Sequence, residues 1–353
     1  MGISVLCGLF GPGGRASGAK CVAASSRGSR FSARAWQLPP GRLTRPSYPG
    51  DSLLRSLFLL LSRQPWLRRW VETSSVAGRL SSRFIAGLTL EEALAACSRL
   101  NRDGMSATLD HLGESVTSPA EAEDSREAYL AALDRIQDLA LESSISAKLT
   151  QLGLNLSEQQ CRANVQTLIE RAQAQGNIVE IDMESSEYVE RTLGIVSDFH
   201  PGSVRAVIQA YLYRSASDLQ ELCRRSIPVR LVKGAYQEPS DVAFPKKSDV
   251  DSNYVHLMTQ LLDTGVNPAI ATHDEKILRT AIEYVQKEKI SASRFEFQML
   301  YGVRRDLQRR LAAEGYRVRL YVPYGNAWYP YFMRRLAERP ANLLFLLRNL
   351  MRN

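Results

Sequence analysis

From about residue 104 onward, short runs rich in β-branched and other apolar residues alternate with longer amphipathic stretches. Most of the short runs have a polar residue at or near their end, and the theme occurs eight times. Runs of this length and composition predict β-strands, and the stretches between them predict helices. The predicted strands occupy residues 106–110, 145–150, 178–182, 205–211, 229–234, 268–273, 294–300 and 318–324.

Two of the predicted helices have clear capping signals. Thr89 with Glu92 predicts a helix start just before the first strand, and Ser157 with Gln160 predicts another after the second strand. Gly176 is placed to end that second helix. Between its ends lies an apolar stripe at helical spacing, made of Cys161, Val165, Leu168, Ile169 and Ala172.

Alternating strands and helices favour a parallel sheet. Eight such units in roughly 250 residues favour a closed (β/α)8 TIM-like barrel over an open doubly wound sheet. No glycine-rich dinucleotide-binding motif follows the first predicted strand, which further disfavours the open sheet. The predicted fold class is therefore α/β, with N-terminal helices in front of the barrel.

In such a barrel the active site forms at the carboxyl ends of the strands. Nearly every predicted strand ends in a side chain that can hydrogen-bond or titrate: Asp110, His111, Lys148, Asp182, Gln209, Lys233, Thr272, His273, Gln298 and Tyr321. One polar strand end often reflects solvent exposure alone. A whole ring of them predicts the active site of an enzyme.

The composition is that of a soluble globular protein, with 353 residues, 44% hydrophobic and 23% charged, and a net charge of +8. Residues 1–50 contain seven Lys and Arg but no acid, which leaves 38 basic and 37 acidic residues in the rest of the chain. Nucleic acid is therefore not a predicted partner. We expect residues 1–50 to be a disordered basic extension, either an organellar transit peptide or the product of a start codon upstream of the native one.

Residues 51–103 predict an N-terminal helical segment, and residues 104–353 the barrel. Residues 53–70 combine leucines and tryptophans with several arginines, but their longest apolar run, 57–61, is too short to span a bilayer. Such a segment either covers the bottom of a domain or lies on a membrane surface.

The sequence lacks the motifs of several classes of enzyme. No Cys/His cluster or HExxH predicts a metal, and neither a serine-hydrolase elbow nor a phosphate-binding loop is present. Lys148 and Lys233 keep a Lys Schiff-base aldolase open, because a desolvated lysine can become a nucleophile. A binding protein with an inert barrel is the other alternative, although the ring of polar strand ends counts against it.

Adjacent arginines, Arg334 and Arg335, follow an aromatic segment near the end of the chain. Two neighbouring guanidinium groups suit bidentate capture of a small carboxylate or phosphate. The other interpretation is a solvated arginine-rich helix face.

Five motifs, in this order, resemble those of proline dehydrogenase, the FAD-dependent first enzyme of proline catabolism. They are RLVKGAY at 230–236, ATH at 271–273, FEFQML at 295–300, YVPYG at 321–325 and RRLAE at 334–338. The resemblance extends from about residue 84 to 353. The length and the Glu238-Pro239 pair resemble the stand-alone bacterial form, because the bifunctional form needs an aldehyde dehydrogenase domain for which the sequence leaves no room.

The resemblance implies a distorted barrel with FAD across its carboxyl face and the last helix over its mouth. It implies catalytic roles for Lys148, Asp182 and Tyr321. Substrate binding is implied for Lys148, Tyr236, Leu300, Tyr321, Arg334 and Arg335. FAD contacts are implied for Gln209, Arg230, Val232, Lys233, Gly234, Ala235, Thr272, His273 and Glu338. A glycine at position 234 has a physical explanation, since a residue without Cβ lets a cofactor approach the backbone.

The implied reaction moves hydride from C5 of L-proline to FAD, forms Δ1-pyrroline-5-carboxylate and passes the electrons to membrane quinone. Asp182 is a general-base candidate by residue type, or else it orients Tyr321 or Lys148. The family often has Trp where this chain has Gln237, so a stacking contact to the flavin is in doubt there. Quinone reduction would give residues 53–70 a purpose and implies a cytoplasmic enzyme held peripherally at the inner face of the membrane, or a mitochondrial one if residues 1–50 are a transit peptide.

Overall fold

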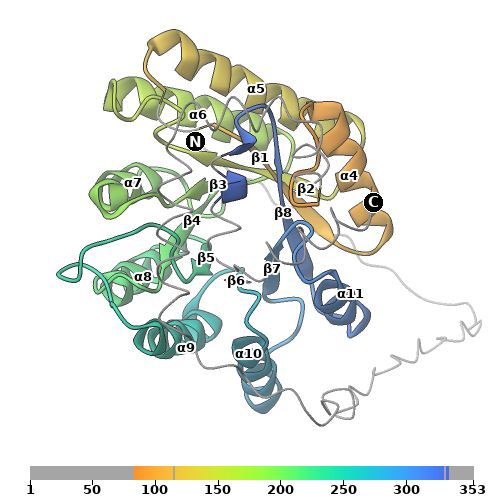
Figure 1. Cartoon of the computed structure of the whole chain (residues 1–353), viewed down its shortest axis with the longest axis vertical. Helices are drawn as coiled ribbons and strands as arrows, with labels where there is room; N and C mark the ends of the chain where they lie inside the picture. Colours follow the sequence, from red (N-terminus) through yellow and green to blue (C-terminus); the bar gives the residue numbers. More distant parts are fainter. Residues whose placement is uncertain (1–82, 114–115, 330, 334–353) are drawn as a thin grey trace, which may run out of the picture. The chain divides into compact units, whose positions relative to one another are not determined.

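The computed structural model describes residues 83–113, 116–329 and 331–333. They form a closed barrel of parallel strands inside a ring of helices (Figure 1). The strands are β1 (Ser106–His111), β2 (Ser143–Lys148), β3 (Val179–Asp182), β4 (Val204–Gln209), β5 (Val229–Val232), β6 (Ala269–Ala271), β7 (Glu296–Leu300) and β8 (Val318–Tyr324). The helices are α4 (Leu90–Arg102), α5 (Pro119–Asp138), α6 (Glu158–Ala174), α7 (Val189–Ser197), α8 (Ser215–Arg224), α9 (Lys247–Thr264), α10 (Glu275–Lys287) and α11 (Arg305–Ala313), with the short 3-10 helix η2 (Ser186–Tyr188).

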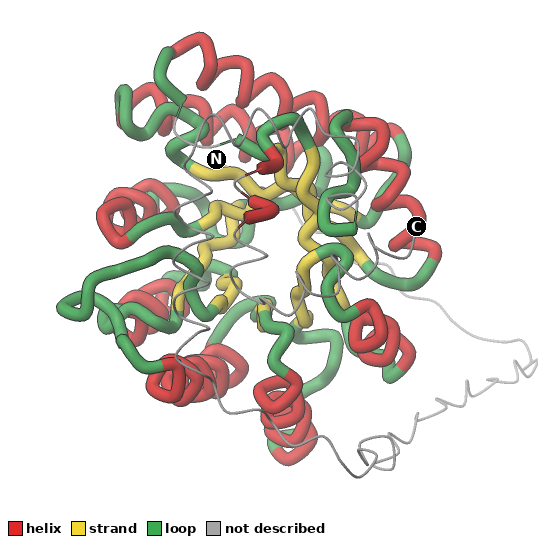
Figure 2. Tube along the Cα trace, in the orientation of Figure 1, coloured by secondary structure: helices red, strands yellow, loops and turns green. Residues whose placement is uncertain are grey.

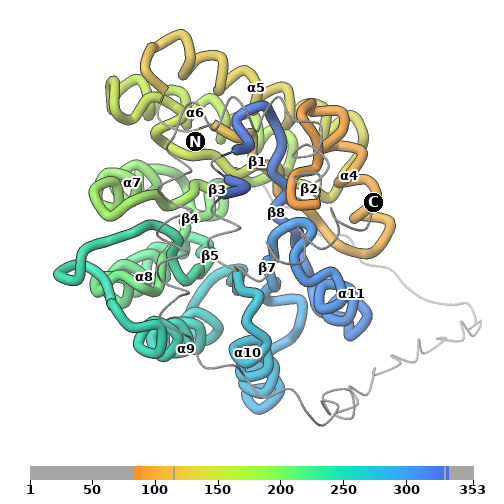
Figure 3. The backbone as a smooth tube through the Cα atoms, viewed as in Figure 1, coloured from red at the N-terminus to blue at the C-terminus, as the bar shows by residue number. Residues whose placement is uncertain are grey.

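Each strand pairs in parallel with the next, and β8 closes the barrel by pairing with β1. The colours of Figure 3 advance around the barrel in sequence order, and the long helices of Figure 2 lie outside the strands. The predicted α/β barrel with eight strands is therefore confirmed. Its carboxyl ends all face one way, because every neighbouring pair is parallel.

Capping explains where the predicted helices begin. Thr89 and Glu92 form a full capping box at the start of α4. At α6 the Ser157 side chain accepts a hydrogen bond from the backbone of Gln160, as predicted. The Gln160 side chain, however, donates to Asn164 further along the helix and does not complete a box.

Some strand limits differ from the prediction. Strand β2 begins at Ser143 and ends at Lys148, because residues 149–152 turn away and the backbone N–H of Leu152 donates to the carbonyl of Lys148. Strand β6 has only three residues, Ala269–Ala271. It begins after Pro268, whose missing N–H cannot join a ladder.

Alternation within the strands separates two environments. Outward-facing residues such as Leu109, Ile145 and Phe297 are fully buried against the surrounding helices. Hydrogen bonds between strands that are not neighbours, such as Thr108 to Glu180 and Arg205 to Glu296, cross the inside of the barrel. The barrel interior is thus polar and charged, and the apolar core lies between barrel and helices.

The chain before β1 packs along the closing strand. The backbone N–H of Ala86 donates to Pro323, and that of Gly325 donates to Gly87. Helix α4, predicted as part of the N-terminal helical segment, packs on β1 and β8. The predictions for residues 1–50 and 53–70, and the prediction of a last helix over the barrel mouth, concern residues 1–82 and 334–353, which lie outside the described residues.

Candidate active site

Four side chains meet near the carboxyl face of the barrel: Asp110, Lys148 and Asp182 from the last residues of β1, β2 and β3, and Tyr321 from the middle of β8. The Lys148 ammonium lies 3.0 Å from Asp110 Oδ1 and 3.5 Å from Asp182 Oδ2. The Tyr321 hydroxyl donates to Asp182 Oδ2 over 2.6 Å. The side chains of Asp110 and Lys148 are only 1% and 9% exposed. The three predicted catalytic residues, Lys148, Asp182 and Tyr321, are therefore brought together in one largely buried cluster.

Arg230 lies directly beneath this cluster, toward the barrel centre. It ion-pairs with Asp182 and approaches Glu180 Oε2 to 2.9 Å. Its guanidinium carbon is 5.3 Å from the ring centroid of Tyr321, within the range of a cation–π contact. Asp182 also accepts a hydrogen bond from Ser146. Asp182 is thus held by neighbours on several strands.

At Asp182 and Lys148, neighbouring charges shift the pKa in the opposite direction from burial. Burial alone would raise the pKa of Asp182, but Arg230 and Lys148 outweigh burial and hold the pKa below its ordinary value. Burial likewise favours a neutral Lys148, but Asp110, Tyr321 and Asp182 raise the pKa of its ammonium well above the ordinary value. At neutral pH the site therefore contains an ionised Asp182 and a charged Lys148.

These protonation states narrow the chemistry. A Schiff-base lysine must be neutral to attack a carbonyl, so a charged Lys148 disfavours the aldolase interpretation for that residue. An ionised Asp182 with a depressed pKa, already accepting from Tyr321, is a weak base. The geometry favours its orienting role over the general-base role.

Asp110 was placed at a strand end by the sequence but given no function there. It is buried at the centre of the cluster, and burial is the main cause of its raised pKa, with the nearby Asp182 charge adding to it. Its Oδ1 accepts from Lys148. Its Oδ2 is a buried oxygen with no hydrogen-bond partner among the described residues.

Four charged residues inside the barrel were not predicted as functional: Glu180, Arg205, Glu296 and Arg319. Arg205 bridges Glu180 and Glu296, at 3.1 and 2.6 Å, and Arg319 binds Glu296 at 3.0 Å. Their signal was a charged residue alternating with apolar neighbours, clearest in β3. Active-site residues were predicted only at the carboxyl ends of strands, whereas these four residues lie near the amino ends of β3, β4, β7 and β8.

The predicted FAD-contact residues occupy one arc of the same rim. All but one lie at the ends of β4 and β5 or just after β5 and β6: Gln209, Val232, Lys233, Gly234, Ala235, Thr272 and His273. Arg230 lies within β5, two residues before its end. Two buried polar atoms on this arc, Gln209 Oε1 and Arg230 Nε, have no hydrogen-bond partner among the described residues. A large ligand with many polar atoms, such as a flavin, fits an arc that leaves buried donors and acceptors available.

Some members of the arc already have partners. Lys233 contacts Asp251 and Asp274, the latter at 2.9 Å. His273 Nε2 accepts from the backbone of Leu300. Glu338 lies outside the described residues.

Gly234 has a structural explanation that differs from the predicted one. Its φ is +112°, and a Cβ there would lie 2.2 Å from a ring carbon of Tyr211. In this structure the missing side chain makes room for the Tyr211 ring.

The predicted substrate residues are only partly described. Leu300 ends β7 and is paired in register with Tyr321. Tyr236 is half-buried in the loop between β5 and α9. Arg334 and Arg335 lie outside the described residues, so the predicted arginine pair stays a prediction.

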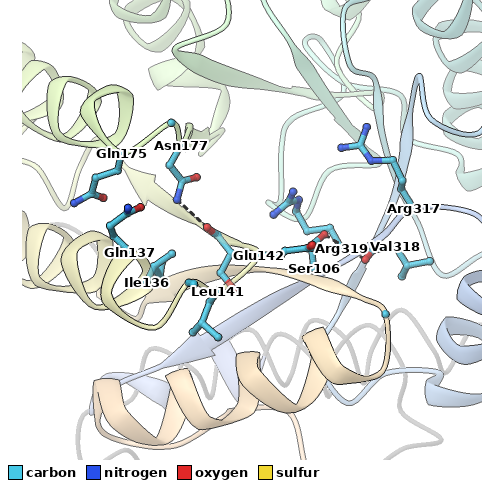
Figure 4. Close-up of a pocket in the computed structure, with 14 residues that line it drawn as sticks. Ser106, Ile136, Gln137, Leu141, Glu142, Gln175, Asn177, Arg317, Val318 and Arg319 are labelled. Atoms are coloured by element: carbon cyan, nitrogen blue, oxygen red, sulfur yellow. Dashed lines mark hydrogen bonds between the residues drawn. The ribbon is translucent and has the colours of Figure 1, made fainter.

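A polar cleft of about 400 Å³ opens at the opposite, amino-terminal end of the barrel (Figure 4). It is lined by the starts of strands, including Ser106, Ser143 and Val318, together with Glu142 and Arg317. Conserved chemistry in this fold occurs at the carboxyl face, whereas the amino-terminal face serves stability. The cluster around Lys148 is therefore the better candidate for the active site.

Two further features of residues 83–113, 116–329 and 331–333 bear on function. Within these ranges no helix combines the length and the apolar character needed to cross a membrane. Across the same described part of the chain, no group of three or more His, Cys, Asp or Glu residues is arranged to bind a metal ion.

Comparison with known proteins identifies the family. The family model described as proline dehydrogenase matches residues 93–348. Proline dehydrogenase 1 of Bacillus subtilis is 42% identical over 305 residues, which are 85% of this chain and 100% of that protein. The proline dehydrogenase of Deinococcus radiodurans is 38% identical over 309 residues, 86% of this chain and 99% of its own.

Among solved structures, proline utilization A (PutA) of Bdellovibrio bacteriovorus superposes with a TM-score of 0.70 and 25% identity. The match covers 81% of this chain but only 37% of that one, so the chain spans little more than a third of that protein. The full-length matches are to the shorter bacterial enzymes. The chain therefore belongs to the proline dehydrogenase family, as an oxidoreductase of proline metabolism related to the stand-alone bacterial enzymes.

Proposed function

We propose that the protein oxidises L-proline to Δ1-pyrroline-5-carboxylate with FAD as the hydride acceptor. The observation that carries the proposal is the charged Lys148 held between Asp110 and Asp182, beside Tyr321. All four residues lie within the range that the proline dehydrogenase family model matches. A buried ammonium in a largely enclosed site is a natural partner for a small carboxylate.

In this proposal FAD is held by the arc from β4 to β6, where Gln209 and Arg230 offer buried polar atoms without partners. Val232, Lys233, Gly234, Ala235, Thr272 and His273 complete the arc, and Glu338 joins it from the last part of the chain. When bound, the flavin supplies hydride chemistry that side chains cannot perform. The protein's contribution is placement.

Lys148, with Arg334 and Arg335, would hold the substrate carboxylate and so fix one end of the ring. Tyr321 and Leu300 would limit its tilt, which converts binding energy into orientation, and Tyr236 would pack on the substrate ring. Asp182 keeps Tyr321 in place through their 2.6 Å hydrogen bond. The substrate amine must be uncharged when the C=N bond forms, because its lone pair forms that bond.

The electrons are proposed to pass on to membrane quinone. Residues 53–70, with their leucines, tryptophans and arginines, would bring the enzyme to the membrane surface on its cytoplasmic side. If residues 1–50 act as a transit peptide, the same contact would be made inside mitochondria.

The test is an absorbance spectrum of the purified protein before and after L-proline, without oxygen. A yellow protein whose blue absorbance bleaches on addition of proline supports cofactor, substrate and reaction direction together. Lys148→Met should bleach far more slowly at the same proline concentration. Lys289→Met, which changes an exposed lysine after α10, should behave like the wild type. A yellow wild type that stays oxidised in excess proline would contradict the proposal.

A further inference from the structure

Tyr211, just beyond β4, makes four contacts with the loop between β5 and α9. Its backbone N–H donates to the carbonyl of Lys233 over 2.9 Å, and its carbonyl accepts from Phe244 over 2.8 Å. Its ring packs on Gly234, where a Cβ would clash with it at 2.2 Å. Its hydroxyl donates to Glu238 over 3.4 Å. One buried residue therefore touches the start, the middle and the end of this loop.

Glu238 connects the same loop to the one that follows β3. It accepts from the backbone N–H of Ser186 over 2.8 Å and from the Ser186 hydroxyl over 2.5 Å. Ser186 begins the 3-10 helix η2. Hydrogen bonds to a charged acceptor are among the stronger ones in proteins. The loops after β3, β4 and β5 are thus joined through Glu238 and Tyr211.

A small apolar cluster supports this junction. It contains Met183 after β3, Val207 of β4, and Tyr211 with Leu212 after β4, and Ala243 joins it from the β5–α9 loop. The junction begins within a few residues of the strand ends that carry Asp182 and Gln209. By contrast, Gln237, in the middle of the loop, is exposed and offers no apolar anchor.

We propose that Glu238 and Tyr211 are positioning residues that hold Tyr236 against the substrate. The inference rests on the proposed function, which assigns Tyr236 to the substrate ring. Tyr236 lies between two fixed points, Gly234 under the Tyr211 ring and Glu238 bound to Ser186. Releasing Glu238 frees the segment that carries Tyr236 without touching Lys148 or Tyr321.

The kinetic consequence is specific. A tyrosine that packs on the substrate ring contributes about equally in the bound substrate and in the transition state. Loss of such uniform binding raises KM and leaves kcat nearly unchanged. A residue that only stabilised the fold would lower the melting temperature without this split.

The experiment compares Glu238→Ala with Asp241→Ala, which removes the same charge from an exposed position of the same loop. Steady-state kinetics with L-proline should show KM raised about 5- to 20-fold in Glu238→Ala, since the loss includes hydrogen bonds to a charged group, with kcat within about twofold. Hydrogen exchange of residues 233–246 should accelerate in the same variant. Asp241→Ala should match the wild type in both measurements.

A second pair removes one hydroxyl from each of two neighbouring tyrosines. Tyr211→Phe should raise KM by about 2- to 5-fold, as expected for one weak hydrogen bond. In Tyr213→Phe the lost hydroxyl bonds the carbonyl of Ser240, further along the same loop, from an exposed position. KM should rise less in this variant than in Tyr211→Phe, because the bond is open to water and lies beyond Glu238 as seen from Tyr236. If Glu238→Ala does not fold, the comparison of Tyr211→Phe with Tyr213→Phe still tests whether the loop contacts position Tyr236.

Unchanged KM in both Glu238→Ala and Tyr211→Phe, in an enzyme that oxidises proline, would overturn the inference. So would a drop in kcat with KM constant. A wild type that binds flavin but does not oxidise proline would overturn the proposed function instead. Loop exchange in that protein would still decide whether Glu238 restrains residues 233–246.

Discussion

Replacing Arg205 by Met tests whether the charges inside the barrel act as one balanced set. The Arg205 guanidinium lies 3.1 Å from Glu180 and 2.6 Å from Glu296, and its side chain is 5% exposed. Met fills similar space but removes the cation that the two carboxylates share.

The expected loss of stability depends on the ion pairs that remain in the variant. Breaking a buried ion pair by removing one partner typically costs about 3–5 kcal/mol. Glu180 keeps Arg230 at 2.9 Å, and Glu296 keeps Arg319 at 3.0 Å. We therefore expect the lower end, about 3 kcal/mol of unfolding free energy, because neither carboxylate is left without a cation. At roughly 2–4 °C per kcal/mol for a domain of this size, the melting temperature should fall by about 6–12 °C.

The assay is thermal and urea unfolding followed by circular dichroism at neutral pH. The matched control is Arg214→Met, which removes a 41% exposed arginine from its pairs with Glu190 and Asp218. Exposed pairs contribute about 0–1 kcal/mol, so this variant should unfold almost like the wild type.

A double variant separates charge from packing. Adding Glu296→Gln to Arg205→Met removes the excess negative charge while keeping the shape of the side chain. The double variant should be less destabilised than the sum of the two single variants, because groups in one network are coupled. Equal losses in Arg205→Met and Arg214→Met, or strict additivity in the double variant, would refute the reasoning.

Further predictions address acid stability, the substrate and the first residues. Burial alone would raise the pKa of Glu296, but Arg319 and Arg205 hold it at about 2, below the ordinary 4.5. The stability that ionised Glu296 contributes is fully present above pH 4.5 and should be lost as the pH falls toward 2. Acid unfolding of Arg205→Met should therefore begin at a higher pH than acid unfolding of the wild type. Arg335→Met should lower kcat/KM for proline about 10- to 1000-fold yet purify yellow, since each hydrogen bond to a charged group contributes roughly 1.5–3 kcal/mol; pyrrolidine, which has no carboxylate, should react equally poorly with both proteins. Tyr321→Ser should improve the use of 4-hydroxyproline relative to proline by opening space, which competition kinetics would measure. Deleting residues 1–50 should leave the flavin content unchanged, because that acid-free region has no periodic apolar face to bury.

The order and number of the strands could be predicted because their signals are local. Alternation within each run and capping residues such as Thr89 and Ser157 depend only on nearby sequence. The strand limits were less accurate, because strand ends depend on pairing with a neighbour. Strand β6, for example, keeps only the residues that can pair with β5 and β7.

The site was predictable to the extent that it lies at strand ends. Lys148, Asp182 and Tyr321 meet there, as the barrel topology and the family motifs predicted. The contact between Tyr211 and Gly234 could not be predicted, because it joins two loops whose paths are set only in the folded barrel. Glu180 did have a local signal, the alternation of charged and apolar residues in β3, but it lies before the end of the strand, and active-site residues were predicted only at strand ends.

The polar interior also makes assembly of the site depend on closure of the barrel. The half formed by β1–β4 contributes three acidic side chains to this network and two basic ones: Asp110, Glu180 and Asp182 against Lys148 and Arg205. The half formed by β5–β8 contributes two basic side chains, Arg230 and Arg319, and one acidic one, Glu296. Neither half can neutralise its own interior, so neither should persist as a stable folding unit. Docking of β8 brings Tyr321 to Asp182 and Arg319 to Glu296 in the same step. Loss of activity and loss of structure in denaturant should therefore coincide, with no active, partly opened barrel between them.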